Sequence, residues 1–159
     1  MNILGIDPGS INCGYGLIRS VATRQSKGNE YISSGRIALS ASSPLHLRLR
    51  ELYASLSEII RQYAPDEIVI EKIFFAKGVK AALSLGHTRG VILLAAAESG
   101  MPIYEYSALE VKKAVVGYGR ADKRQVQLMV REILKLRHNL SPDSADALAL
   151  ALCHANTGR

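Results

Sequence analysis

The order of the apolar segments is the feature that most constrains the fold of this chain. Three short strand-like segments come first, and helical periodicity then alternates with two further strands; the five strands are expected at residues 2–7, 14–21, 30–39, 67–71 and 103–106. Three consecutive strands indicate an antiparallel meander. The alternation that follows indicates helices packed on a sheet. The sequence therefore predicts an α/β fold, a mixed five-stranded sheet flanked by helices.

Start and stop signals place the helices between and after these strands. The first helix opens at Ser42-Ser43-Pro44 and ends before Pro65, and the second occupies residues 79–99. Ser107 and Glu110 form a capping box for a third helix. The last two helices are expected to start at Asp122 and at Ser141-Pro142-Asp143, the latter reaching about His154.

Length and composition indicate one globular domain, residues 1–159. The longest purely apolar run, residues 91–97, is far shorter than the roughly 20 residues that span a bilayer. The N-terminal residues lack the basic region and apolar core of a signal peptide. The two cysteines, Cys13 and Cys153, form neither a disulfide framework nor a ligand cluster. We expect a soluble, cytoplasmic protein with reduced thiols and no contact with a membrane.

Positive charge is concentrated in two stretches of the chain. The formal net charge is +6, and residues 72–97 carry four bases and no acid, while residues 111–131 carry six bases and one acid. Phosphates neutralised by Lys and Arg release counterions, so such stretches suit a nucleic acid. A solvated basic surface is the alternative interpretation.

Four carboxylates stand out against this basic background. Asp7 and Glu71 each end a short apolar strand, and adjacent strands would bring both acids to one edge of the sheet. Asp143 and Asp146 lie three residues apart at the start of the last helix, hence on one face. Asp7 in a turn and Asp143 at a helix N-terminus also have ordinary structural explanations, whereas Asp146 lies in an apolar helix where a carboxylate needs a compensating charge.

Clustered carboxylates repel one another and need a cation. Oxygen ligands without a Cys/His cluster favour Mg²⁺, or Mn²⁺, over Zn²⁺, with one or two ions per subunit. Such ions activate water and stabilise the leaving oxygen of a phosphodiester. Basic flanks around an acidic centre are what a nuclease requires.

Two adjacent aromatic residues follow Glu71. Phe74 and Phe75 are the only phenylalanines of the chain. Adjacent positions in a loop usually point in opposite directions, so we expect one of the two rings to pack in the core and the other to stack on an unpaired base.

Five short motifs follow one another along the chain: Ile6-Asp7-Pro8-Gly9-Ser10 with Gly14-Tyr15-Gly16, Ile70-Glu71 with Phe74, Leu85-Gly86-His87 with Arg89-Gly90, Val111-Lys112 through Gly119, and Asp143 with Asp146-Ala147-Leu148-Ala149. Taken in this order, they resemble the RuvC-type Holliday-junction resolvases of bacteria. The resemblance implies a ribonuclease-H-like fold, a homodimer, divalent-metal catalysis, paired nicks across four-way junction DNA, and a branch-migration helicase as partner.

Carried over by position, Asp7, Glu71, Asp143 and Asp146 match the catalytic acids of that family. Lys112 and Lys123 match bases near the scissile phosphate. We expect DNA contacts from Phe74 and from the basic stretches, namely Lys77, Lys80, Arg89, Lys112, Lys113, Arg120, Lys123 and Arg124.

Two other function classes compete with a nuclease. Asp7-Pro8-Gly9-Ser10 also resembles the phosphate loop of actin- and hexokinase-like ATPases, but those enzymes hold nucleotide between two such domains. A noncatalytic junction- or nucleic-acid-binding relative of the same fold would keep the bases and lose the acids. The helix expected at residues 79–99 is apolar around most of its circumference, which favours a dimer interface over the central helix of a monomer.

Overall fold

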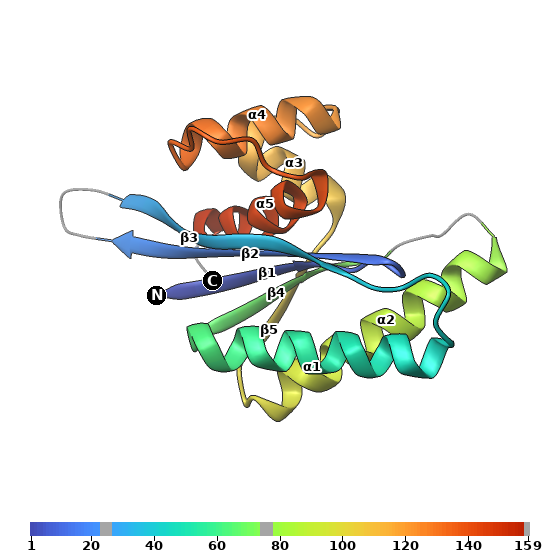
Figure 1. Cartoon of the computed structure of the whole chain (residues 1–159). Helices are drawn as coiled ribbons and strands as arrows, with labels where there is room; N and C mark the ends of the chain where they lie inside the picture. The colour runs from blue at the N-terminus through green and yellow to red at the C-terminus, as the bar shows by residue number, and fades with distance from the viewer. Residues whose placement is uncertain (23–26, 74–77, 158–159) are drawn as a thin grey trace.

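The computed structural model describes residues 1–22, 27–73 and 78–157. These residues form one sheet of five strands with helices on both faces (Figure 1). The strands are β1 (Asn2–Asp7), β2 (Asn12–Ala22), β3 (Lys27–Ala38), β4 (Glu67–Glu71) and β5 (Ile103–Tyr106). The helices are α1 (Leu45–Tyr63), α2 (Val79–Glu98), α3 (Ala108–Val116), α4 (Lys123–Ile133) and α5 (Pro142–Thr157). Within these ranges no helix has the length and apolar character that a membrane crossing requires.

The strand order is β3-β2-β1-β4-β5, and the sheet is mixed as predicted. The first three strands form an antiparallel meander, and β4 and β5 run parallel to β1. The pair β2–β3 extends further than predicted, to Ala22 opposite Lys27. The outer part of this hairpin is polar, so its ladder continues without the apolar alternation on which the sequence prediction depended.

The two faces of the sheet carry different helices. Figure 1 shows α1 and α2 on one face and α3, α4 and α5 on the other. Because side chains alternate along a strand, Leu4 and Ile6 of β1 pack in the core beneath α1 and α2. Ile3, with Val69 of β4, packs instead in the core beneath α5. Asp7, four residues beyond Ile3, and Glu71, two residues beyond Val69, continue the same alternation and therefore face the α5 side.

Helix α5 lies against the backbone of β1 and β2, and glycines make that approach possible. A Cβ atom added to Gly5 would stand 2.0 Å from the carbonyl oxygen of Ala147. One added to Gly14 would stand 2.1 Å from the carbonyl oxygen of Asp143, and one on Gly16 would stand 2.6 Å from the amide nitrogen of Leu148. No side chain fits at these positions. The glycines near the start of the chain thus set the position of the last helix.

We predict that Gly14→Ala displaces the N-terminus of α5 and lowers both stability and activity. The added methyl group would collide with backbone at Asp143, which cannot rotate away, so we expect a loss of about 1–3 kcal/mol in the free energy of unfolding. Gly28→Ala is the control, because nothing lies within 4 Å of its added Cβ. Urea denaturation measures both variants. Equal stabilities for the two would contradict the close-approach argument.

Candidate active site

Asp7 and Glu71 end two neighbouring strands at the same edge of the sheet. Ile6 is paired with Ile70 in the parallel β1–β4 ladder, so Asp7 and Glu71 follow side by side, on strands about 4.8 Å apart. Both side chains are partly buried. The sequence prediction that these two acids meet at one sheet edge is confirmed.

The N-terminus of α5 brings the other two acids to this edge. Ser141 caps the helix by accepting a hydrogen bond from the Ser144 amide at 3.2 Å, which places Asp143 in the first turn and Asp146 one turn later. Asp146 lines the same cavity as Asp7 and Glu71. Asp143 is not among the lining residues, although its charge acts on both Asp7 and Asp146.

Two capped helices place lysines opposite the acids. Ser107 and Glu110 form the predicted capping box of α3, and Asp122 and Gln125 form one at the start of α4. Lys112 of α3 and Lys123, the first residue of α4, both line the cavity. Lys123 Nζ lies 3.6 Å from Asp146 Oδ2. A cation in the first turn of a helix opposes the helix dipole, so the carboxylates facing it are what stabilise it there.

The acids and lysines surround a cavity of about 360 Å³, floored by apolar residues of α3, α4 and α5. A second cavity of about 540 Å³ adjoins it and shares Pro8, Glu71 and Ala108 with it. The second cavity extends past Lys72 toward Leu85 of α2. Asp7 and Asp146 line the first cavity alone, and Glu71 lies where the two cavities adjoin.

Burial and mutual repulsion raise the pKa values of three of the acids. Burial, followed by the charge of Asp146, raises the pKa of Asp7 from its usual 3.8 to about 7. Burial is also the main cause that raises the pKa of Glu71 and of Asp146. The charge of Lys123 acts in the opposite direction on all three. A cation bound among these acids would stabilise their ionised forms, so its binding would release protons.

The donor set fits a hard divalent cation. Among the residues that the structure describes, no group of three or more His, Cys, Asp or Glu side chains is arranged to enclose a metal ion by itself. Mg²⁺ does not require such an enclosure, because it keeps several waters and binds through one or two carboxylates together with substrate phosphates. Asp7, Glu71 and Asp146 around this cavity supply carboxylates of that kind.

Apart from Lys112 and Lys123 in the cavity, the predicted DNA-contacting bases fall into three groups. Lys80, Lys113, Arg120 and Arg124 are exposed, as phosphate contacts must be. Arg89 is different: its side chain is only 20% exposed and forms an ion pair with Glu105 of β5. Its Nη1 atom is buried without a hydrogen-bond partner among the described residues, so the ion pair leaves part of the guanidinium unsatisfied, and the DNA contact of Arg89 stays a prediction. Lys77, like Phe74 and Phe75, lies outside the described residues.

Sequence reasoning missed a polar network on α5. Three of the four histidines, His46, His87 and His138, are exposed. His154 is buried and joined to Glu67 and Tyr106 by hydrogen bonds. The only available signal was a histidine near the end of an apolar helix.

Cys13 and Cys153 are free and buried, and burial raises the pKa of each thiol, to about 12 and about 11.

We predict that Asp7 makes the metal-free protein less stable as the pH rises. A carboxyl whose pKa is higher in the folded than in the unfolded state adds stability below about pH 4 that is lost as the pH approaches 7. Asp7→Asn removes this dependence, so at pH 8 with chelator the variant should exceed the wild type by roughly 2–4 kcal/mol in unfolding free energy. Denaturation at pH 4 and pH 8 measures the difference. An equal difference in unfolding free energy between variant and wild type at pH 4 and at pH 8 would contradict the raised pKa of Asp7.

Comparison with known proteins identifies the family. The family model described as Crossover junction endodeoxyribonuclease RuvC matches residues 3–154. The relative of that name from Saccharophagus degradans is 50% identical over 155 residues, 98% of this chain and 87% of that protein. The one from Vibrio cholerae is 50% identical over 157 residues, 99% of this chain and 88% of that protein.

A solved structure agrees with the sequence relatives. Thermus thermophilus RuvC in complex with Holliday junction substrate superposes with a TM-score of 0.91 and 34% identity, covering 100% of this chain and 95% of that one. The resemblance seen in the sequence motifs is thereby confirmed, and with it the ribonuclease-H-like fold. This chain belongs to the RuvC family of crossover junction endodeoxyribonucleases.

Proposed function

We propose that this protein is a metal-dependent endonuclease that resolves four-way DNA junctions by paired symmetric nicks, in recombination and DNA repair in the cytoplasm. The observation that carries the proposal is the cavity in which Asp7, Glu71 and Asp146 face Lys112 and Lys123. Membership of the RuvC family supports it. A noncatalytic relative would need no such collection of acids.

The acids are the proposed metal ligands. Asp7, Glu71 and Asp146 would hold one or two Mg²⁺ ions, or Mn²⁺, with Asp143 as the fourth acid of the cluster. Bound there, the metal would supply an activated water and charge neutralisation for phosphodiester hydrolysis. Asp7, whose pKa burial raises to about 7, would give up its proton when the metal binds, and the carboxylate oxygens of the cluster would orient the ion.

The lysines have a separate role at the phosphate. Lys112 and Lys123 reach the cavity from two different helices, so they can contact a phosphate from two sides. Positive charge there offsets the negative charge that develops in the transition state. Lys113, the neighbour of Lys112, is exposed and lies outside the lining of the cavity, so we assign it to binding alone.

The function is tested by cleavage of a synthetic four-way junction. We expect Mg²⁺ or Mn²⁺ to support nicking, and Asp7→Asn, Glu71→Gln and Asp146→Asn to lower the rate by at least about 10³-fold at saturating DNA while binding persists. Asp143→Asn should be milder. Labelled-junction cleavage and band-shift assays measure the two effects.

A lysine pair provides the matched control. Lys112→Ala should lower the cleavage rate at saturating DNA by about 10- to 100-fold. Lys113→Ala should instead weaken binding and lower its salt dependence by about 0.9 per lost phosphate contact. Junction binding by the wild type without nicking in any divalent metal would favour the noncatalytic alternative.

A homodimer is the second part of the proposal. One acid cluster per chain makes one nick, and a two-fold dimer presents two clusters with the symmetry of the junction. Helix α2 offers the interface, since Val79, Leu83 and Leu94 are 78%, 58% and 52% exposed. A groove of about 490 Å³ between the starts of α1 and α2 continues this apolar surface through Leu45. By family resemblance, we also propose a branch-migration helicase as a partner.

We predict that Leu83→Glu yields a monomer that loses paired nicking. A charge in the middle of an apolar interface is not compensated across a two-fold axis, because the same charge approaches from the partner. Sedimentation should report a mass near 17.2 kDa for the variant and twice that for the wild type. Leu128→Glu on α4, where Leu128 is 49% exposed, is the control and should remain dimeric. A monomeric wild type that cleaves junctions in pairs would refute the dimer.

A further inference from the structure

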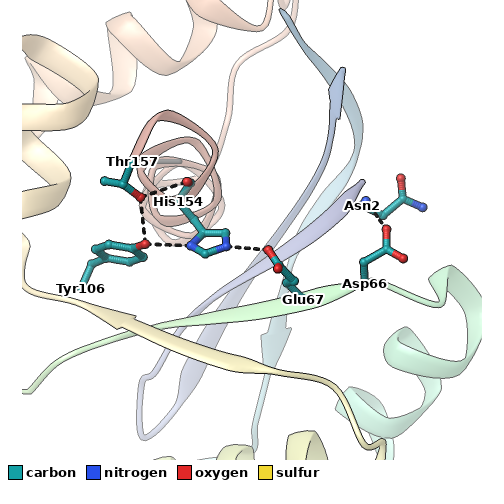
Figure 2. Close-up of polar contacts among 6 residues, drawn as sticks. All are labelled: Asn2, Asp66, Glu67, Tyr106, His154 and Thr157. Atoms are coloured by element: carbon teal, nitrogen blue, oxygen red, sulfur yellow. Dashed lines mark hydrogen bonds and ion pairs between the residues drawn. The ribbon is translucent and has the colours of Figure 1, made fainter. Parts of the chain in front are cut away.

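A partly buried polar network, shown in Figure 2, lies at the C-terminal end of α5, whereas Asp143 and Asp146 lie near the N-terminal end of the helix. His154 Nε2 lies 2.5 Å from Glu67 Oε2, at the start of β4. His154 Nδ1 lies 2.7 Å from the hydroxyl of Tyr106, the last residue of β5. That hydroxyl also lies 2.9 Å from Thr157 Oγ1. The His154 side chain is completely buried, and that of Glu67 is 14% exposed.

The contacts of the network match the donor and acceptor capacity of its groups. In the tautomer with a hydrogen on Nε2, His154 donates to the Glu67 carboxylate, and Nδ1 accepts from the Tyr106 hydroxyl. Thr157 Oγ1 lies within hydrogen-bond distance of both the Tyr106 hydroxyl, at 2.9 Å, and the carbonyl oxygen of His154, at 3.0 Å. Both ring nitrogens of the buried His154 therefore have a partner.

The network connects α5 to the two strands that the glycine contacts do not reach. Gly5, Gly14 and Gly16 hold α5 against β1 and β2. His154 and Thr157 hold it against β4 and β5. Hydrogen bonds of 2.5–2.9 Å are directional, so they restrict sliding of the helix along the strand more than alanine and leucine contacts do.

Two rigid segments lead from this network to the metal-binding acids. Glu67 and Glu71 are the two ends of β4, about 13 Å apart at the usual rise of a strand. Asp146 and His154 are eight residues apart on α5, or about 12 Å. The helix runs antiparallel to the strand over nearly equal lengths. Fixing His154 on Glu67 at one end consequently fixes Asp146 relative to Glu71 at the other.

We propose that Glu67, Tyr106 and His154 are positioning residues for the metal site: they set the spacing between Asp146 on α5 and Glu71 on β4. The inference rests on the metal-dependent function proposed above. The three side chains touch neither the cavity nor the acids that line it. Their contribution is the axial position of the helix that carries two of the four acids.

The test measures metal affinity without DNA. Titration of Mn²⁺ into the junction-free protein, followed by electron paramagnetic resonance, gives a Kd for the site. Tyr106→Phe removes one hydroxyl, and Glu67→Ala removes the partner of Nε2. We expect each to weaken Mn²⁺ binding by about 3- to 10-fold, less than the 10- to 100-fold typical when a ligand's own hydrogen-bond partner is lost. Glu67→Gln should restore most of the affinity, because its amide can still hydrogen-bond to His154.

Ile60→Val provides the stability control. Ile60 is buried in α1, on the other face of the sheet. Its truncation should lower the Tm about as much as Tyr106→Phe does and leave the Kd for Mn²⁺ unchanged. The Mg²⁺ concentration for half-maximal junction cleavage should rise only in the network variants, with no change in junction affinity.

The outcomes separate this proposal from the proposed function. Wild-type affinity for Mn²⁺ in both Tyr106→Phe and Glu67→Ala, at a lowered Tm, would reduce the network to a structural role and leave the nuclease function intact. An equally weakened Mn²⁺ affinity in Ile60→Val would also overturn the proposal, since any loss of stability would then be enough to weaken metal binding. If the wild type bound no Mn²⁺, or if Asp7→Asn left its Mn²⁺ affinity unchanged, both proposals would be overturned together.

Discussion

The structure depends on the direct contact between the backbone of α5 and the glycine positions of β1 and β2. Gly5, Gly14 and Gly16 leave no space for a side chain beneath the helix. The carbonyl of Asp143 lies over Gly14, so the start of the helix is held at the sheet edge where Asp7 and Glu71 emerge. The acid cluster follows from this backbone contact rather than from any interaction among the acids, which repel one another.

That repulsion gives the site its chemistry. The folded protein keeps Asp7, Glu71 and Asp146 partly buried, and burial together with neighbouring charge raises their pKa values. Lys123 relieves part of the repulsion from 3.6 Å away. A bound divalent cation would relieve the rest, and its binding would release protons. The same unfavourable electrostatics that reduces the stability of the metal-free fold therefore favours metal binding.

The sequence was sufficient to predict the fold class and the meeting of Asp7 and Glu71 at one sheet edge, for a definite physical reason. Apolar strands that end in an acid, and a Ser-Pro-Asp helix start, are local patterns, and parallel neighbouring strands then bring their ends together. Partners on separate elements were not predictable in this way. Glu67 and His154 are 87 residues apart, and neither has a periodic signal. The ion pair between Arg89 of α2 and Glu105 of β5 likewise had no local signal in the sequence.

Two kinds of contact hold helix α5 on the sheet, backbone contacts with glycines and side-chain hydrogen bonds. Near its acids, backbone contacts with glycine fix its height above the sheet, because a contact between main chains leaves no side chain to rotate. At its other end, the hydrogen bonds of His154 fix its position along β4 and β5. A site built on rigid elements holds its ligands more precisely than one built on loops. Because the acids come from β1, β4 and α5, their spacing is set by the register between elements, and that register is determined well away from the cavity.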